Sequence, residues 1–258
     1  MNKKQKITAS LSTGIIIIAF VAYLLFTEKT LCKGVDISFS GKEDVRLIDR
    51  GSIEKIIFSE YENLIGSPVD NVNLEKLEKK IETLPSVKNA EVFKKINGIL
   101  GVKIEQRKPL LRVFPENGKG FYIDEEGELM PLSKNGTVKV ITVNGNIKYE
   151  YNGKNITVAD TNITQTLKDI YNLVKLISKD DFLKTQTEQI YVTSNNEFEL
   201  VPLAGNHTVL LGDMFDYENK MRHLKYFYTD VLNNEGWKNF SYINLKYKGQ
   251  IVCTKNKE

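Results

Sequence analysis

The side chains that could carry out chemistry in this sequence are few and poorly placed for it. Its two histidines, His207 and His223, have no cysteine or acidic residue at the spacing of metal ligands. The two cysteines, Cys32 and Cys253, have no histidine at a suggestive distance, and no Gly-x-Ser-x-Gly nucleophile motif occurs. The sequence therefore predicts no metal site, no cofactor and no catalytic residue.

Acidic clusters are the next candidates for chemistry. Asp180-Asp181 and Asp124-Glu125-Glu126 resemble acid–base pairs, but both fall in predicted turns, where carboxylates cap and hydrate the chain. Asn-X-Ser/Thr triplets could accept glycans in a secretory pathway. Because the sequence is rich in Asn, chance is the preferred explanation for the five triplets, which start at Asn135, Asn155, Asn162, Asn206 and Asn239.

Charge and hydropathy change sharply near the N-terminus. The segment from Ile7 to Thr27 has no charged side chain, and Lys3, Lys4 and Lys6 precede it. A spanning helix needs about 20 apolar residues, so we expect a transmembrane helix at 7–27, a cytoplasmic tail at 1–6 and export of the remainder. A cleaved signal peptide would need a small-residue cleavage site, which is missing.

The expected exported part carries no net charge, because the formal charge of +3 minus the three N-terminal lysines is zero. A neutral domain has no overall electrostatic attraction to nucleic acid. Nucleic-acid partners are therefore not expected, and neither is a small-molecule substrate.

Residues 34–113 have the pattern of a small two-layer domain. A strand at 35–39 precedes a helix opened by Ser52, and Asn73 caps a second helix whose apolar residues recur at helical spacing. Strands at 87–95 and 99–106 follow, joined by a turn at Asn97-Gly98. In this β-α-α-β-β order, two helices can cover one face of a three-stranded sheet.

Residues 114–258 indicate an antiparallel β domain with two helices, so the predicted fold class is α+β. A hairpin surrounds Asp124–Gly127, and helices are expected at 164–178 and 215–233. Further strands are expected at 138–143, 147–151, 188–193, 197–202 and 207–211. The last expected strand, 241–252, places Ile243, Leu245, Tyr247 and Ile251 on one face and Tyr242, Asn244, Lys246, Lys248 and Gln250 on the other.

Three motifs resemble the FtsQ/DivIB family of bacterial cell-division proteins. The first is Leu84-Pro85-x-Val87-x-x-Ala90-x-Val92 followed by the corner Gln106-Arg107-Lys108-Pro109, which is similar to the end of the family's POTRA domain. The second is Tyr122-Ile123-Asp124-x-x-Gly127 with Met130-Pro131-Leu132. The third is Tyr242-Ile243-Asn244-Leu245-Lys246-Tyr247, in which Asn244 and Lys246 replace the usual Asp and Arg. The motif residues of interest are Ala90, Val92, Arg107, Pro109, Asp124, Gly127 and Pro131.

The resemblance implies a non-enzymatic, single-pass protein of the bacterial inner membrane at the division septum. Its POTRA domain (34–113) and C-terminal β domain (114–258) would be periplasmic or extracytoplasmic. The implied partners are FtsB- and FtsL-like coiled-coil proteins and membrane proteins of septal wall synthesis. Partner contacts are expected on the last strand, at Tyr242, Asn244, Lys246, Tyr247, Lys248 and Gln250. Arg107 and Lys108 are additional candidates, although the corner also reads as a simple strand end before Pro109.

Other interpretations remain open from the sequence. The last strand could be an ordinary edge guarded by its lysines. The chain could also be a type II secretory-pathway glycosyltransferase or hydrolase, which would share the membrane anchor. A third candidate is a POTRA adaptor for polypeptide transport, whose client would add to an edge of the first domain.

Overall fold

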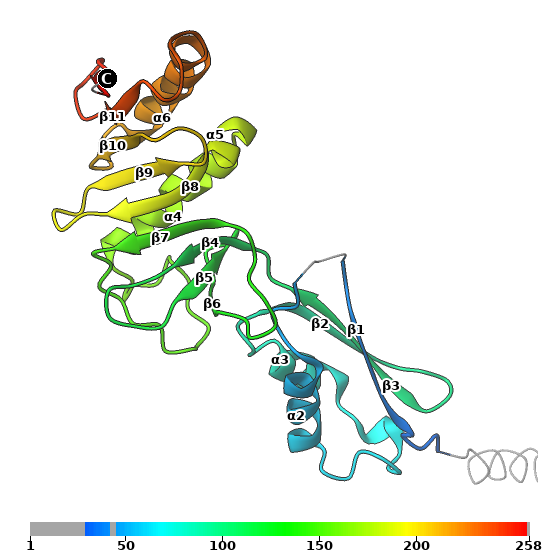
Figure 1. Cartoon of the computed structure of the whole chain (residues 1–258). Coiled ribbons are helices and arrows are strands. Elements are labelled where there is room, and N and C mark those ends of the chain that lie inside the picture. Colours follow the sequence, from blue (N-terminus) through cyan, green and yellow to red (C-terminus); the bar gives the residue numbers. More distant parts are fainter. Residues whose placement is uncertain (1–28, 42–44, 257–258) are drawn as a thin grey trace, which may run out of the picture.

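The computed structural model describes residues 29–41 and 45–256, which form two domains in chain order (Figure 1). The first domain contains a three-stranded sheet of order β1-β3-β2, in which β1 runs parallel to β3 and β2 runs antiparallel to it. Its elements are β1 (Gly34–Phe39), α2 (Arg50–Glu60), η1 (Val69–Asn71), α3 (Leu74–Ile81), β2 (Val87–Lys94) and β3 (Ile99–Gln106).

Local signals explain both helices of the first domain. The side chain of Asn73 accepts a hydrogen bond from the backbone N–H of Lys76, as expected of an N-cap. The helix predicted to open at Ser52 begins earlier, because Asp49 is its cap and accepts from the N–H of Ser52 at 2.8 Å. The buried faces of the two helices, which include Ile53, Ile57, Leu77 and Ile81, pack on the sheet in one core.

The second domain is built on a nine-stranded sheet of order β12-β11-β10-β9-β8-β7-β4-β5-β6. Its strands are β4 (Pro109–Val113), β5 (Phe121–Asp124), β6 (Leu129–Pro131), β7 (Ile141–Gly145), β8 (Thr187–Val192), β9 (Phe198–Pro202), β10 (Thr208–Gly212), β11 (Phe240–Asn244) and β12 (Val252–Lys255). The helices are α4 (Gln165–Ser178), α5 (Asp181–Gln186), α6 (Tyr217–Tyr226), the π-helical η2 (Phe227–Leu232) and α7 (Asn233–Glu235).

Helices cover only one face of the large sheet (Figure 1). The register places Ile190, Leu200, Val209 and Ile243 in one row across β8 to β11, and all four are buried in the core that includes α4 and α6. Residues that alternate with this row face the other side, and Tyr191 and Tyr242 are 42% and 49% exposed there. The sheet therefore has one packed face and one open face.

The predicted fold class was wrong in its description of the second domain. The sheet is mixed, because β4–β7, β7–β8 and β10–β11 are parallel pairs. The chain passes through α4 and α5 between β7 and β8, and through α6 between β10 and β11, and such helical crossovers return a strand in the same direction. The helix α5 was not expected, and the strand expected at 147–151 does not form.

The predicted fold class also included a membrane-spanning helix, and no such helix is found among the residues that the structure describes. No helix within residues 29–41 and 45–256 combines the length and the apolar character needed to cross a bilayer. The helix predicted at 7–27 lies outside the described residues.

The expected last strand, 241–252, is also wrong, because the chain forms a hairpin there. β11 ends at Asn244, and β12 starts at Val252 after a turn in which Gly249 has a φ of 69°. That φ lies in the left-handed region, which glycine adopts without steric cost. The strand at the end of the sheet is therefore β12, and β11 is flanked on both sides.

Candidate interaction edge

An edge strand presents unpaired backbone groups, so the edges of the two sheets are the first places to look for partner binding. The β2 edge of the first domain is closed by α3. Glu78 accepts a hydrogen bond from the N–H of Val92 at 2.8 Å, and Glu82 accepts one from the N–H of Ala90 at 3.1 Å. These carboxylates occupy the groups that an added strand would need.

The β1 and β6 edges are also covered by the chain itself. The guanidinium of Arg50 donates to the carbonyl of Ile37 on β1 at 2.7 Å. At the other end of the large sheet, the N–H of Leu129 on β6 donates to the carbonyl of Ile156 at 2.8 Å, and Pro131 has no N–H to offer. Both strands are therefore partly protected against pairing with another chain.

The outer side of β12 has no neighbouring strand in the described part of the chain. Two contacts indicate which of its backbone groups face β11. The N–H of Asn256 donates to the carbonyl of Asn239, and the hydroxyl of Ser241 donates to the carbonyl of Thr254. Because alternate residues of a strand direct their polar groups to opposite sides, those of Cys253 and Lys255 face outward.

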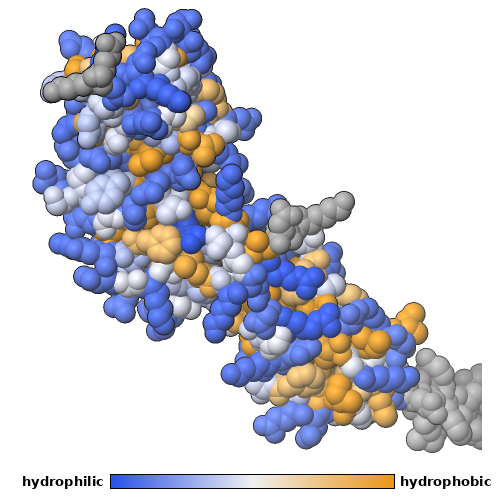
Figure 2. Space-filling view, viewed as in Figure 1, coloured by the Kyte–Doolittle hydropathy of each residue, from blue (hydrophilic) through white to orange (hydrophobic). Residues whose placement is uncertain are grey.

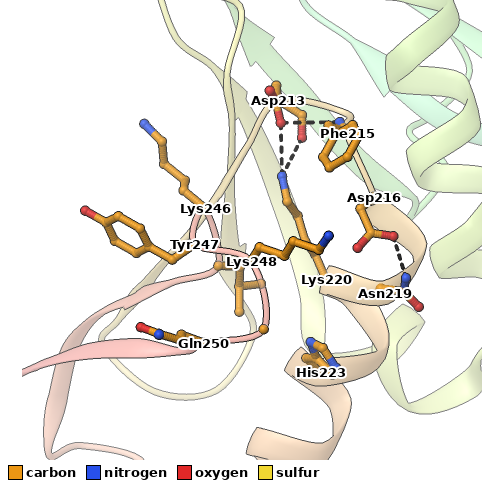
Figure 3. Close-up of a pocket in the computed structure, with 12 residues that line it drawn as sticks. Asp213, Phe215, Asp216, Asn219, Lys220, His223, Lys246, Tyr247, Lys248 and Gln250 are labelled. Carbon is orange, nitrogen blue, oxygen red and sulfur yellow. Dashed lines mark hydrogen bonds and ion pairs between the residues drawn. The ribbon is translucent and has the colours of Figure 1, made fainter.

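A pocket lies where the β11–β12 turn meets the start of α6 (Figure 3). Lys220 forms an ion pair with Asp213 at 3.1 Å, and the side chains of Lys246 and Tyr247 point away from them. Lys246 pairs with Glu197 at 2.6 Å, and this bond raises the pKa of Lys246. Two of the lysines that line the pocket are thus already paired within the chain.

The residues predicted to bind partners divide between β11 and this turn. Tyr242 lies on the open face of the sheet, and Asn244 accepts a hydrogen bond from the N–H of Lys246 at 2.9 Å. Tyr247 is 57% exposed. Lys246, Tyr247, Lys248 and Gln250 lie in the turn, so the structure brings the six residues together at one end of the sheet but on two different elements.

The other predicted candidates lie at the junction of the two domains. Arg107 is mostly buried and donates to Asp124 at 3.0 Å and to Glu126 at 3.2 Å. Lys108 is exposed. Pro109 begins β4, pairs in register with Asp124, and so opens the large sheet directly after β3 ends at Gln106. The corner thus connects the domains, and a partner role for Arg107 and Lys108 stays a prediction.

The remaining motif residues lie in the core, at a strand end or in a turn, where they support the fold. Ala90 and Val92 are buried on β2, and Pro131 ends β6. Gly127 closes the β5–β6 turn with a φ of 91°, and a Cβ there would meet Val158 at 2.6 Å. Only glycine satisfies both the backbone angle and the close approach.

Sequence reasoning missed β12 itself and the carboxylates of Glu78 and Glu82. The Lys248-Gly249 dipeptide was an available signal for a turn within 241–252. No local signal marks Glu78 and Glu82, because their acceptor role depends on how α3 packs along β2.

One of the two histidines, His207, is a buried core residue. His207 is 3% exposed, and its Nε2 lies 3.1 Å from the hydroxyl of Tyr228. Burial lowers the pKa of His207. Over the described ranges, no three His, Cys, Asp or Glu side chains gather in a way that could hold a metal ion.

Comparison with known protein families agrees with this two-domain division. Residues 30–105 match the model of a POTRA-like domain, and residues 108–254 match the model described as FtsQ/DivIB, C-terminal related. No curated protein matches the chain. Because the second match covers more than half of the sequence, the chain belongs to the FtsQ/DivIB family of bacterial cell-division proteins.

Proposed function

We propose that this protein is a scaffold of the septal division complex that binds FtsB- and FtsL-like coiled-coil partners by strand addition at β12. Its family consists of non-enzymatic division proteins, which supports a role in assembly. The observation that carries the proposal is the outer side of β12, which lacks a neighbouring strand in the described chain. A partner segment can pair with such an edge through main-chain hydrogen bonds.

Protection of the other edges favours β12 over a site in the first domain. A strand adding to β2 would have to displace the carboxylates of Glu78 and Glu82. This arrangement argues against the alternative role as a polypeptide-transport adaptor, which needs a client edge in the POTRA-like domain. Lysines on an edge do discourage pairing, but Lys246 is engaged with Glu197, and Lys255 is the one lysine within β12.

Side chains beside the edge can supply selectivity. Val252 and Tyr242 are 45% and 49% exposed on the open face, and Tyr247 is exposed in the neighbouring turn. Aromatic side chains offer large contact areas at low cost in conformational entropy. The predicted residues Asn244, Lys246, Lys248 and Gln250 complete this surface around the edge.

The test is to remove one outward N–H from β12. Cys253→Pro deletes this donor, and an edge strand tolerates proline. We expect the variant to lose capture of an FtsB-like partner by the full-length chain. Cys253→Val is the matched control, because it keeps the N–H and a similar apolar volume, and we expect it to bind normally.

Folding must be checked by circular dichroism and thermal unfolding of both variants. Equal capture by a folded Cys253→Pro variant would rule out strand addition at β12. Loss of capture in both variants would instead point to the Cys253 side chain and contradict a main-chain mode.

A further inference from the structure

Three loops of the first domain meet at the end where the described chain begins. The N–H of Cys32 donates to the carbonyl of Ser67 at 2.8 Å, which joins the entering chain to the loop after α2. The N–H of Lys33 donates to the carbonyl of Gly98 at 2.8 Å, which joins it to the β2–β3 turn. Residues 30–33, 64–68 and 95–98 therefore form one end of the molecule (Figure 1).

Each of these loops exposes one large aliphatic side chain. Ile96 at the β2–β3 turn is 102% exposed, Ile65 is 52% exposed and Leu31 is 48% exposed. We call this set the apolar tip. Residues of high hydropathy are visible on the surface of this end of the molecule (Figure 2). A group of exposed aliphatic side chains at one end of a folded domain indicates an interaction surface.

The charged side chains around the apolar tip are arranged so that its three aliphatic side chains can be buried without burying an unpaired charge. Lys95 pairs with Asp36 at 2.6 Å and Lys94 pairs with Asp70 at 3.2 Å, so the two lysines that precede Ile96 are compensated within the domain. Lys29 and Lys33 are exposed on either side of Leu31. Long lysine side chains can keep their ammonium groups in water while apolar neighbours are buried.

We propose that the apolar tip contacts lipid at the boundary between headgroups and acyl chains. The uncharged segment Ile7–Thr27 directly precedes this end in the sequence, and the family is one of division-septum membrane proteins. A bilayer needs no complementary shape, which suits three side chains that protrude from separate loops. Exposed aliphatic residues flanked by Lys are a typical combination at membrane interfaces.

The apolar tip lies in the first domain, and strand addition would occur at the far end of the second. Lipid contact is thus independent of binding at β12. It would place the first domain directly on the membrane and hold β12 away from it, because the large sheet extends from the opposite end of the first domain (Figure 1).

The experiment introduces a tryptophan at the apolar tip. Full-length Ile96→Trp is mixed with phosphatidylethanolamine–phosphatidylglycerol vesicles, with and without lipids brominated near the headgroup end of their acyl chains. Phe215→Trp is the matched control, because Phe215 is also an exposed apolar residue, at 72%, but lies beside α6 in the second domain. The wild type, whose single tryptophan is Trp237, gives the background emission.

We expect bromine to lower the emission added by Ile96→Trp roughly twofold, since the quencher acts only on contact with the acyl-chain boundary. The emission added by Phe215→Trp should not change. Equal quenching of both variants, or no quenching of Ile96→Trp, would overturn the proposal. Because Ile96 lies in the first domain, away from β12, capture of the coiled-coil partner by Ile96→Trp should be unaffected whichever quenching result is found.

Discussion

Arg107 and Asp124 form an ion pair that joins the two domains. Their atoms Nη1 and Oδ2 are 3.0 Å apart, and the two side chains are 17% and 4% exposed. Asp124 also accepts hydrogen bonds from the backbone N–H groups of Glu126 and Glu128. One carboxylate thus closes the β5–β6 hairpin and holds the end of the first domain.

Removing Arg107 should destabilise the protein more than removing its neighbour. Arg107→Ala leaves the buried Asp124 carboxylate without its cation, which costs about 2–3 kcal/mol of unfolding free energy. Lys108→Ala is the matched control, because Lys108 is exposed, and it should change stability by less than about 0.5 kcal/mol. Urea unfolding of both variants measures the difference. Equal effects would show that the pair does not stabilise the junction.

Opening the β2 edge should cause self-association. The double variant Glu78→Leu, Glu82→Leu leaves the N–H groups of Val92 and Ala90 without their acceptors on an edge strand. We expect its mass by light scattering to rise with concentration relative to the wild type. The matched Glu78→Gln, Glu82→Gln variant keeps an acceptor oxygen at each position and should behave as the wild type. A double Leu variant that stays at the wild-type mass would contradict a protective role.

His207 should make stability depend on pH. Its ordinary pKa is about 6.5, and burial lowers the folded-state pKa. As the pH falls, His207 therefore binds a proton in the unfolded chain before it does so in the folded chain. The contribution of His207 to the free energy of unfolding is full above pH ~6.5 and decreases below that pH until the folded-state pKa is reached. Thermal unfolding midpoints from pH 7.5 down to about 5 would show this.

Replacing His207 tests whether this side chain causes the pH dependence. His207→Gln should flatten the same curve while lowering stability, since it changes the contact with Tyr228. An unchanged slope in His207→Gln would assign the dependence to other groups.

Depletion of the protein in its host tests the division role at the level of the cell. We expect undivided filaments, because a missing scaffold stops the assembly of septal wall synthesis. Cells complemented with Cys253→Val should divide, and cells complemented with Cys253→Pro should remain filaments. Normal division after complete depletion would remove the proposed function.

The first domain follows closely from its sequence, because its signals are local. Asn73 caps α3, the alternating residues of 87–106 form two strands, and Asn97-Gly98 turns between them. Hydrophobic periodicity and turn chemistry depend on neighbouring residues and can be read without tertiary contacts. The β5–β6 hairpin around Asp124 and Gly127 was predictable for the same reason.

Strand direction and edges in the second domain were decided by tertiary structure. The alternation within 241–252 is compatible with one long strand, yet the pairing of β11 with β10 and with β12 stops at Asn244, and the chain turns back through Gly249. Parallel pairing of β7 with β8 could have been suspected from the helix between them, but pairing partners are set by long-range burial.

For individual side chains too, some roles could be inferred from the sequence and others only from the folded structure. Composition and spacing alone indicated a chain without metal or catalytic motifs, and the three motifs identified its family. Only the folded chain decided that Arg107 faces Asp124, that Glu78 and Glu82 close β2, and that β12 ends the large sheet. These contacts join residues from separate elements, so their geometry depends on packing, which no local pattern specifies.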